Sequence, residues 1–446
     1  MKTPIYDFVK EYAQSGTTRF HMPGHKGRGV LGCEKYDITE IGGADVLYHA
    51  DGIIAESENN ASALFKTAHS FYSTEGSTLA IKAMILLAYQ KAQSKQRNDK
   101  ILAARNAHSA FINACALIDL DVEWIKSDNA HLCVSEISAL DVKNALDSAD
   151  KLPFAVYLTS PDYLGNMADI EGISAVCHEY GVPLLVDNAH GAYLAFLDES
   201  RHPIALGADM CADSAHKTLP VLTGGAYLHV SQRCAHFADN ARAALRLFAS
   251  TSPSYLTLSS LDLANSALVD GYSARIADMA KRVTELKTEL VDNGILSVGN
   301  EPLKLTLDCY SFGYFGNEIA TMLREKNIEC EFADSRYIVL MISPENTQDE
   351  LEALKSALLS IEKKTPIFVE APIMHNASVR ALSIREAVLA PHESVSAENS
   401  LGRICAAPAV SCPPAIPIAV SGEVIDGSAV AQLKFYGIES VEVVKL

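Results

Sequence analysis

The chain has 446 residues, 48% of them hydrophobic, so it is long enough for roughly two or three domains with a sizeable core. Its 55 acidic residues outnumber the 37 basic ones, and the net charge of −18 argues against nucleic acid as a partner, because phosphate binding needs a basic footprint. The sequence shows neither a signal peptide nor the run of about 20 apolar residues that predicts a membrane span. The ten cysteines lack zinc-ligand spacing, so we expect no metal site and a reducing, cytoplasmic location.

In the N-terminal part of the chain, the sequence predicts a short helix followed by an irregular segment. Apolar residues recur at helical spacing over residues 4–14, which favours a helix. Residues 19–27 contain Pro and Gly, together with two histidines, an arginine and a lysine. This segment is either an anion-holding loop or an ordinary basic loop. We assign residues 1–45 to an N-terminal arm.

The next stretch predicts a helix over residues 55–70, a short strand over 71–74 and an apolar helix over 79–90. The turn between the strand and the second helix reads Glu75-Gly76-Ser77-Thr78. Gly, Ser and Thr at a helix start offer free backbone N–H groups, hydroxyls and the positive end of the helix dipole, which suits a phosphate. Ser and Thr are also favoured as ordinary N-caps, so the turn alone leaves both interpretations open.

Four apolar runs predict strands of a mostly parallel sheet with helices on both faces, which is an α/β fold. The runs are residues 101–104, 154–158, 182–186 and 226–230. In such sheets, ligands bind at the carboxyl ends of the strands. The polar residues expected near those ends are His108, Asp187, His190 and Lys217.

The sequence surroundings of two of these residues, Lys217 and Asp187, suggest chemical roles. Lys217 ends the run Asp213-Ser214-Ala215-His216-Lys217, between an apolar segment and a Gly-rich turn. Burying an ammonium group is costly unless it is paired or converted, and a lysine in such a setting can form a Schiff base with an aldehyde. Asp187, just past an apolar strand, could bind a metal, orient a histidine, pair with a protonated ring nitrogen or cap a helix.

A long amphipathic helix over residues 274–293 is predicted to join a large domain, residues 46–295, to a smaller α+β domain, residues 296–446. The strands and helices predicted in the smaller domain are 303–308, 316–326, 337–342 and 348–363. Its tail, residues 366–446, contains a helical segment near 384–387. The tail also contains a Pro-rich run, Cys412-Pro413-Pro414-Ala415-Ile416-Pro417, which cannot be a regular central element.

Taken together, the motifs resemble the short form of the Orn/Lys/Arg decarboxylase family, whose members are pyridoxal 5'-phosphate (PLP) enzymes of the aspartate-aminotransferase fold, fold type I. The resemblance covers nearly the whole chain in the right order. The motifs that carry it are Phe20-His21-Met22-Pro23-Gly24-His25-Lys26-Gly27, Glu75-Gly76-Ser77-Thr78, Arg105-Asn106-Ala107-His108, Val186-Asp187-Asn188-Ala189-His190-Gly191, Asp213-Ser214-Ala215-His216-Lys217, Thr251-Ser252-Pro253 and Cys412-Pro413-Pro414-Ala415-Ile416-Pro417.

The resemblance implies roles for individual residues. Lys217 carries PLP covalently, Asp187 pairs with the pyridine nitrogen and so keeps the ring an electron sink, and His108 stacks on the ring. His216 or Lys217 returns a proton to Cα. The other cofactor-binding residues that it implies are Gly76, Ser77, Thr78, Ala189, His190, Ser214, Thr251 and Ser252. Thr251 or Ser252 reaches the phosphate of a neighbouring subunit, which implies a homodimer or higher even oligomer with shared active sites.

The implied function is decarboxylation of lysine, ornithine or arginine to the corresponding amine, a reaction of polyamine biosynthesis. One alternative is an aminotransferase or lyase of the same fold; an aminotransferase needs an arginine for the substrate α-carboxylate, which Arg336 or Arg380 could supply. Another is a catalytically impaired PLP-binding paralogue, because Glu75 stands where the family usually has Asn. A basic substrate needs a carboxylate near its distal cation, and the sequence does not choose among the candidates, which are Glu40, Asp45, Glu331 and Asp334.

Overall fold

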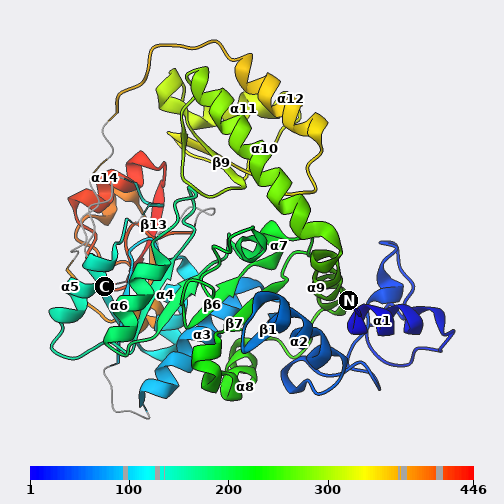
Figure 1. The fold of residues 1–446 in the computed structure, drawn as a ribbon. Coiled ribbons are helices and arrows are strands. Elements are labelled where there is room, and N and C mark those ends of the chain that lie inside the picture. Colours follow the sequence, from blue (N-terminus) through cyan, green and yellow to red (C-terminus); the bar gives the residue numbers. More distant parts are fainter. Residues whose placement is uncertain are drawn as a thin grey trace. The chain divides into compact units, whose positions relative to one another are not determined.

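The computed structural model describes residues 1–93, 99–125, 131–134, 136–369, 372, 379–407 and 415–445. The chain divides into two compact units, one made of Met1–Arg97 and Cys177–Arg275 and the other of Asn98–Val176 and Ile276–Leu446. The main sheet has seven strands in the order β1-β7-β6-β5-β4-β2-β3. Figure 1 labels β1, β6 and β7 of this sheet. This mostly parallel sheet confirms the α/β class, whereas the domain boundaries after residues 45 and 295 stay predictions.

The strands of the first unit are β1 His69–Ser73, β5 Leu184–Asp187, β6 Met210–Asp213 and β7 Ala226–Val230. Here β5 and β6 run parallel, while β7 is antiparallel to both β6 and β1. The second unit contributes β2 Lys100–Ala103, β3 Asp121–Trp124 and β4 Ala155–Thr159, with β2 parallel to β3 and β4. The central strands β5, β6 and β7 are buried along their whole length, as expected for a helix-covered sheet.

The α-helices of the first unit are α1 Pro4–Gln14, α2 Ile53–Phe65, α3 Gly76–Gln93, α7 Ala215–Thr218, α8 Ala238–Phe248 and α9 Tyr255–Ala267. Apolar residues cover most faces of α3, and a helix of this kind is stable only when it is buried. The helix predicted over 55–70 was too long, because α2 ends at Phe65. Lys66 caps it in the left-handed conformation, and β1 begins at His69.

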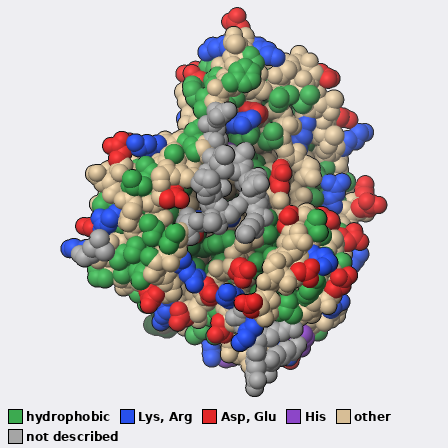
Figure 2. Space-filling model, turned by 90° about the vertical axis from the view of Figure 1, so that its left-hand side faces the viewer, with side chains coloured by type: hydrophobic (Ala, Val, Ile, Leu, Met, Phe, Trp, Pro, Cys, Tyr) green, Lys and Arg blue, Asp and Glu red, His purple; other side chains and the backbone are tan. Residues whose placement is uncertain are grey.

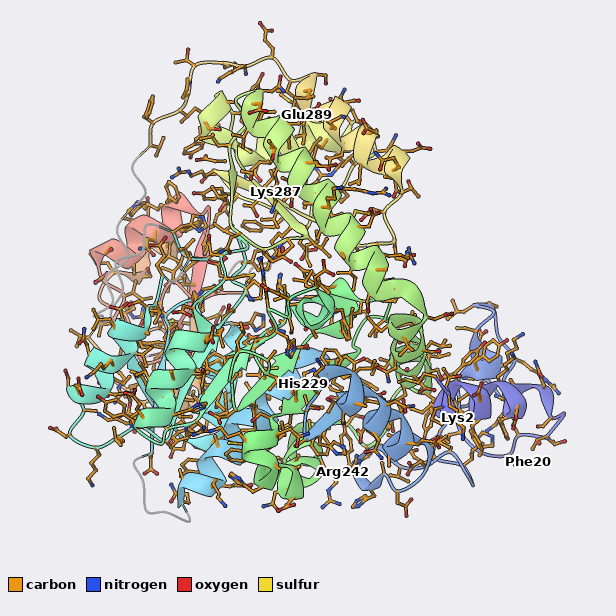
Figure 3. The ribbon with its side chains drawn as sticks, in the orientation of Figure 1. Lys2, Phe20, His229, Arg242, Lys287 and Glu289 are labelled. Carbon is orange, nitrogen blue, oxygen red and sulfur yellow. The ribbon has the colours of Figure 1, made fainter. Side chains whose placement is uncertain are left out.

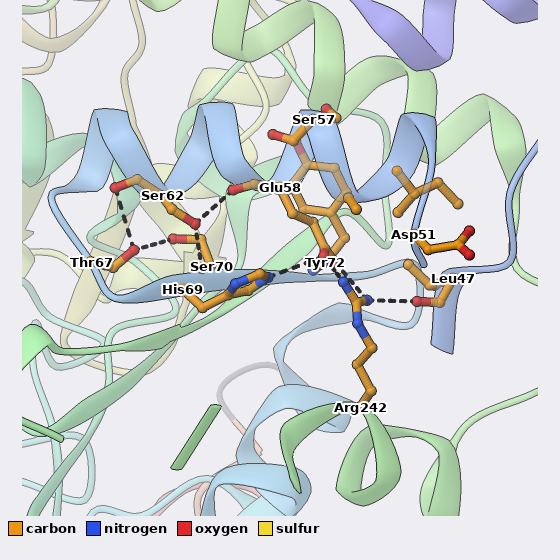
Figure 4. A network of polar contacts seen from close by, with 12 residues as sticks. Leu47, Asp51, Ser57, Glu58, Ser62, Thr67, His69, Ser70, Tyr72 and Arg242 are labelled. Carbon is orange, nitrogen blue, oxygen red and sulfur yellow. Dashed lines mark hydrogen bonds and ion pairs between the residues drawn. The ribbon is translucent and has the colours of Figure 1, made fainter. Parts of the chain in front are cut away.

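A buried carboxylate ties β1 to the helices around it. Glu58 on α2 is fully buried and accepts hydrogen bonds from Arg242 Nη2 (2.5 Å) and from the Tyr72 backbone N–H (3.0 Å) (Figure 4). His69 Nε2 lies 3.2 Å from the same carboxylate, and Arg242 Nη1 also donates to Leu47 O. An unpaired buried charge is costly, so these contacts fix the strand that leads into the turn at residue 75.

The second unit contains α4 Ser109–Ile118, α5 Ala139–Asp147, α11 Gly316–Arg324, α12 Gln348–Leu359, α13 Ile384–Leu389 and α14 Gly427–Phe435. A four-stranded antiparallel sheet has the order β10-β11-β9-β8, with strands Phe332–Ala333, Tyr337–Met341, Lys304–Asp308 and Ser297–Val298. A second small sheet pairs β12 His392–Ser396 with β13 Ser440–Val444. These two sheets confirm the predicted smaller α+β part.

Two α-helices include residues of both units: α6 Ile170–Glu179 and α10 Ser273–Asp292. The predicted helix 274–293 therefore agrees with α10 to within one residue at each end. Figure 3 labels Lys287 and Glu289 on α10. Lys287 Nζ donates to Glu301 O (2.8 Å), and Glu289 lies 3.4 Å from Lys355 Nζ on α12, so α10 is tied to the small sheet region by polar contacts.

Most other predicted elements agree with the structure to within a few residues, but several helices and the strands β3, β6, β8, β10, β12 and β13 were not predicted. The sequence of β6, Met-Cys-Ala-Asp, lacks the β-branched and aromatic residues that signal a strand. Residues 412–414 of the predicted Pro-rich run lie outside the described residues.

No helix in the described part of the chain is long and apolar enough to cross a membrane. Basic and acidic side chains are interspersed on the face that Figure 2 shows.

A buried carboxylate holds the start of the N-terminal helix. Asp262 on α9 accepts hydrogen bonds from the backbone N–H groups of Ile5 (2.9 Å) and Tyr6 (3.0 Å) and from Ser57 Oγ (2.5 Å). Burial raises the pKa of Asp262 to about 6, although these donors oppose the shift. The carboxylate therefore ionises in the folded protein only at a higher pH than in the unfolded chain.

We expect Asp262→Asn to remove a pH-dependent loss of stability. The wild type loses stability as the pH rises from 3.8 through about 6, since the folded state then gives up a proton that it binds more tightly than the unfolded chain. Relative to wild type, the variant should gain about 1–2 kcal/mol of unfolding free energy between pH 5 and pH 8, measured by denaturant titration. Asp51→Asn, at an exposed carboxylate, is the control; equal pH profiles for all three proteins contradict the prediction.

Candidate active site

The ends of β5 and β6 bring a lysine and a histidine together. Lys217 lies in the short helix α7, directly after β6, and its Nζ is 3.0 Å from His190 Nε2. His190 follows β5 after a short turn and is 5% exposed. The parallel pairing of the two strands therefore places a primary amine beside a buried imidazole. The catalytic roles of both residues stay predictions.

Asp187 ends β5 and is 2% exposed. Its Oδ1 accepts a hydrogen bond from the Ala189 backbone N–H (3.1 Å), which holds the carboxylate at the start of the turn that leads to His190. A buried carboxylate at a strand end suits a cationic partner such as a protonated ring nitrogen, because pairing offsets the cost of burying its charge.

The turn between β1 and α3 has the features of an anion site. Gly76 has φ +70°, which favours glycine, and its N–H donates to Gly224 O (2.8 Å). A Cβ atom at Gly76 would meet nothing within 4 Å, so the space beside the turn is open. Ser214 Oγ donates to Ser77 Oγ (2.8 Å), and both residues are buried, whereas Thr78 is exposed. The N-terminus of an 18-residue helix adds its positive dipole end.

Glu75 occupies the first position of this turn, and its carboxylate binds a backbone group. Its Oε1 accepts a hydrogen bond from the Ser250 N–H at 2.8 Å. Thr251 and Ser252, which follow, are exposed. The turn and the 250–252 segment are therefore tied together within one subunit, and the predicted reach of Thr251 or Ser252 to a neighbouring phosphate stays a prediction.

His216 is held in one orientation by a backbone carbonyl. Its Nδ1 donates to Gly225 O at 3.0 Å. Burial lowers the pKa of His216, and the positive charge of Lys217 lowers it further, although the bond to Gly225 opposes both. The imidazole is therefore neutral near pH 7, with its lone pair on Nε2. Thr218, the next residue but one, has a buried hydroxyl without a hydrogen-bond partner among the described residues, and no sequence motif singled it out.

His108 belongs to the second unit. It is the N-cap of α4, and its Nδ1 accepts a hydrogen bond from the Ala110 N–H (3.0 Å). An N-cap satisfies one of the free backbone donors at a helix start, so this contact fixes the ring. Its stacking on a cofactor ring stays a prediction.

A buried network that the sequence did not reveal surrounds Asp213, the last residue of β6. Its carboxylate accepts hydrogen bonds from Asn188 Nδ2 (2.7 Å) and His202 Nε2 (2.9 Å), and it lies 3.3 Å from His229 Nε2. Burial alone would raise the pKa of Asp213, but the two histidines hold it below its usual range. His202, Cys211 and Asp213 place potential ligand atoms within 4.8 Å of one another, but nitrogen donors already occupy the carboxylate, and we assign no metal.

The four acids proposed for a substrate cation already have partners. Asp45 accepts backbone N–H groups, among them those of residues 52 and 54. Asp334 pairs with the buried His131 at 3.0 Å. Glu331 accepts from a tyrosine hydroxyl (3.1 Å) and Glu40 from a threonine hydroxyl (2.5 Å). The structure therefore gives Asp45 and Asp334 structural roles and selects none of the four for the substrate.

Comparison with known proteins gives matches over nearly the full length of the chain. A family model described as "Orn/Lys/Arg decarboxylase, major domain" matches residues 3–298. The uncharacterised protein YaaO of Bacillus subtilis is 31% identical over 97% of this chain and 94% of its own length. An arginine decarboxylase of Halalkalibacterium halodurans is 30% identical over 97% of this chain and 93% of its own. The lysine decarboxylase LdcF of Francisella novicida superposes with a TM-score of 0.76 at 18% identity, covering 99% of this chain and 81% of that chain. The structural likeness confirms fold type I.

We expect Asp213→Asn to destabilise the protein by about 3–5 kcal/mol at pH 7, because the change removes the negative charge that Asn188, His202 and His229 surround in a buried network. Denaturant unfolding of the full chain measures this loss. Asp239→Asn, at an exposed position in the first turn of α8, makes the same chemical change as a control. A loss no larger than that of the control would show that the network contributes no stability.

Proposed function

Because the chain belongs to the Orn/Lys/Arg decarboxylase family, whose members are PLP-dependent amino-acid decarboxylases, we propose that it converts a basic amino acid to the corresponding amine and CO2. The single observation that carries this proposal is the 3.0 Å contact between Lys217 Nζ and His190 Nε2 at the strand ends where Asp187 is also buried. Lysine, ornithine and arginine are the candidate substrates, and arginine is the first to test, since the named relatives include arginine decarboxylases.

The residues of the first unit fit PLP. When bound, PLP supplies the electron sink that accepts the electron pair left on Cα as CO2 departs. Lys217 offers the amine for its covalent attachment, and the buried Asp187 carboxylate offers a partner for the ring N–H. The N–H groups at the start of α3 and the Ser77 and Ser214 hydroxyls offer a site for the phosphate. His108, from the second unit, is assigned to the ring face.

Proton transfer is assigned to Lys217 rather than His216. The Nδ1–H of His216 is committed to Gly225 O, and the lowered pKa keeps Nε2 unprotonated near neutral pH, so this imidazole is a proton acceptor. A group that returns a proton to Cα must hold one, so Lys217, the other group that the family resemblance offers for this step, is assigned to it. His190, at hydrogen-bond distance, orients that amine.

The competing activities are less well supported. An aminotransferase needs an arginine for the substrate α-carboxylate, but Arg336 makes two hydrogen bonds to Asp308 (3.1 and 2.8 Å) and Arg380 is paired with Asp121. The paralogue without activity was suggested by Glu75, whose carboxylate is bound to the Ser250 N–H. A carboxylate held by a backbone donor carries a partly compensated charge, which favours a phosphate-competent turn.

We further propose a homodimer or higher even oligomer with shared active sites. Thr251 and Ser252 are exposed in the single chain and so are free to reach a second subunit. The N-terminal arm exposes large apolar side chains, which favours burial against another copy. These side chains are Phe20 (92% exposed), Met22 (68%), Val30 (100%) and Leu31 (81%). The amine product is assigned to polyamine biosynthesis.

Incubation of the full chain and PLP with each basic amino acid, with product identification by mass, tests the activity. We expect CO2 and the amine from at least one substrate. Lys217→Ala should lose at least roughly 1000-fold in rate and the absorption of bound PLP, because it lacks both the covalent link and the proton donor. Lys281→Ala, at an exposed position on α10, is the control. Keto-acid formation would identify an aminotransferase, and no turnover of lysine, ornithine or arginine would refute the proposal.

We expect Glu75→Gln to tighten PLP binding roughly two- to tenfold, because an amide still accepts the Ser250 N–H while one negative charge leaves the phosphate turn. Titration of the cofactor-free protein with PLP, followed by absorbance, gives the dissociation constant. Glu56→Gln, in the first turn of α2, removes the same charge elsewhere in the unit. Unchanged or weaker binding in the Glu75 variant alone would mean that this carboxylate does not repel the phosphate.

A further inference from the structure

A buried ion pair joins the turn after β2 to the C-terminal tail, here residues 379–407 and 415–445. Arg105 is 5% exposed, and its Nη2 donates to Glu423 Oε2 (2.9 Å) and to Ile418 O (3.1 Å). Glu423 is 6% exposed, and the same Oε2 accepts the Val420 N–H (2.7 Å). Removing one partner of such a pair leaves an uncompensated buried charge, so each holds the other in place.

The tail contacts both ends of α4. At the start of the helix, the Ser109 N–H donates to Ala415 O (2.9 Å). At its end, Arg385 Nη1 donates to Ala116 O (3.2 Å) and Leu117 O (3.1 Å). The last carbonyls of a helix have no partner within it, and a cation there is favourable. The tail residues 385 and 415 therefore hold the two ends of one ten-residue helix, and Glu423 holds the turn before it; we call these three contacts the clamp.

His108 lies inside this clamp. It stands three residues after Arg105 and directly before α4, which it caps through Nδ1. Asn106, between them, is 3% exposed, and neither polar atom of its side chain has a hydrogen-bond partner among the described residues. The Asn106 side chain therefore adds no hydrogen bond that fixes the turn among these residues, and the Arg105 anchor and the start of α4 both contribute to the placement of the imidazole.

We propose that the tail positions His108 for the reaction, with Glu423 acting through Arg105 as a positioning residue. This inference rests on the proposed function, in which His108 faces the ring of PLP. Glu423 lies more than 300 residues from Arg105 in sequence, so this contact brings a distant segment to the turn that carries His108. A tail that only adds stability would leave the cofactor environment unchanged when its charge is removed.

The single tryptophan of the chain reports on this clamp directly. Arg105 Cζ lies 5.0 Å from the centre of the Trp124 ring, and Trp124 is also 6.1 Å from the Phe111 ring on α4. Trp124 fluorescence in the cofactor-free protein therefore senses both the anchor and the helix without any turnover.

The test is Glu423→Gln, which keeps the shape and removes the charge. We expect altered Trp124 emission without PLP, a changed absorption spectrum with PLP, and a kcat reduced roughly 10- to 100-fold with a smaller change in KM. Glu398→Gln, which breaks an exposed ion pair with Lys434 in the same tail, is the control and should match wild type in all three. Equal unfolding temperatures of the two variants would exclude general destabilisation as the cause.

Wild-type kcat and a wild-type PLP spectrum in Glu423→Gln would overturn the proposal, whether or not Trp124 emission changes. Should this variant fail to fold, Arg385→Gln releases the other end of α4 through a more exposed contact and should shift the same spectrum in the same direction; no shift would overturn the proposal. Failure of the wild type to decarboxylate any basic amino acid refutes the proposed function alone, because the emission and PLP spectra still test the clamp.

Discussion

Parallel pairing of β5 and β6 is the constraint on which the candidate site depends. In this register Asp187 lies opposite Ala212, so the two chains leave the sheet side by side. One continues to His190 and the other to Lys217, and their side-chain nitrogens come within 3.0 Å. Neither residue is on a long flexible loop: a tight turn and one short helix connect them to buried strands. The side chains of Lys217 and His190 are therefore positioned by rigid, buried strands at the centre of the sheet.

Buried charges then fix the turns around that centre. Glu58 holds β1 through Arg242, and β1 leads into the turn proposed for the phosphate. Asp213 holds the end of β6, the strand that leads to Lys217, through two histidines and an amide. The carboxylates of Glu58 and Asp213 each lie on or next to a strand that leads into a turn of the candidate site. A buried charge tolerates little displacement, because its partners must stay in contact with it. Stability and positioning are then properties of the same contacts.

The sequence predicted features formed by neighbouring residues and missed contacts between residues that are far apart along the chain. Lys217, Asp187 and the turn at 75–78 belong to contiguous motifs, so the order of residues along the chain is enough to propose roles for them, and these roles stay predictions. The partner of Arg105 is 318 residues away, and His202 meets Asp213 only because the chain folds back, so no spacing rule points to either pair. Strand β6 was overlooked since its residues have low strand propensity and are held by neighbours on both sides, where tertiary context decides.

Glu75 shows how a departure from a family pattern can change meaning once its contacts are known. As a bare charge beside a phosphate turn it suggested an impaired site. Bound to the Ser250 N–H, it connects that turn to the segment carrying Thr251 and Ser252. In the oligomer proposed above, this segment would serve the phosphate of the second subunit, so the Glu75 carboxylate would contact a segment that belongs to a second site. Occupancy of one phosphate turn would then bear on the position of the segment that completes the other, since the Glu75 contact joins the two directly.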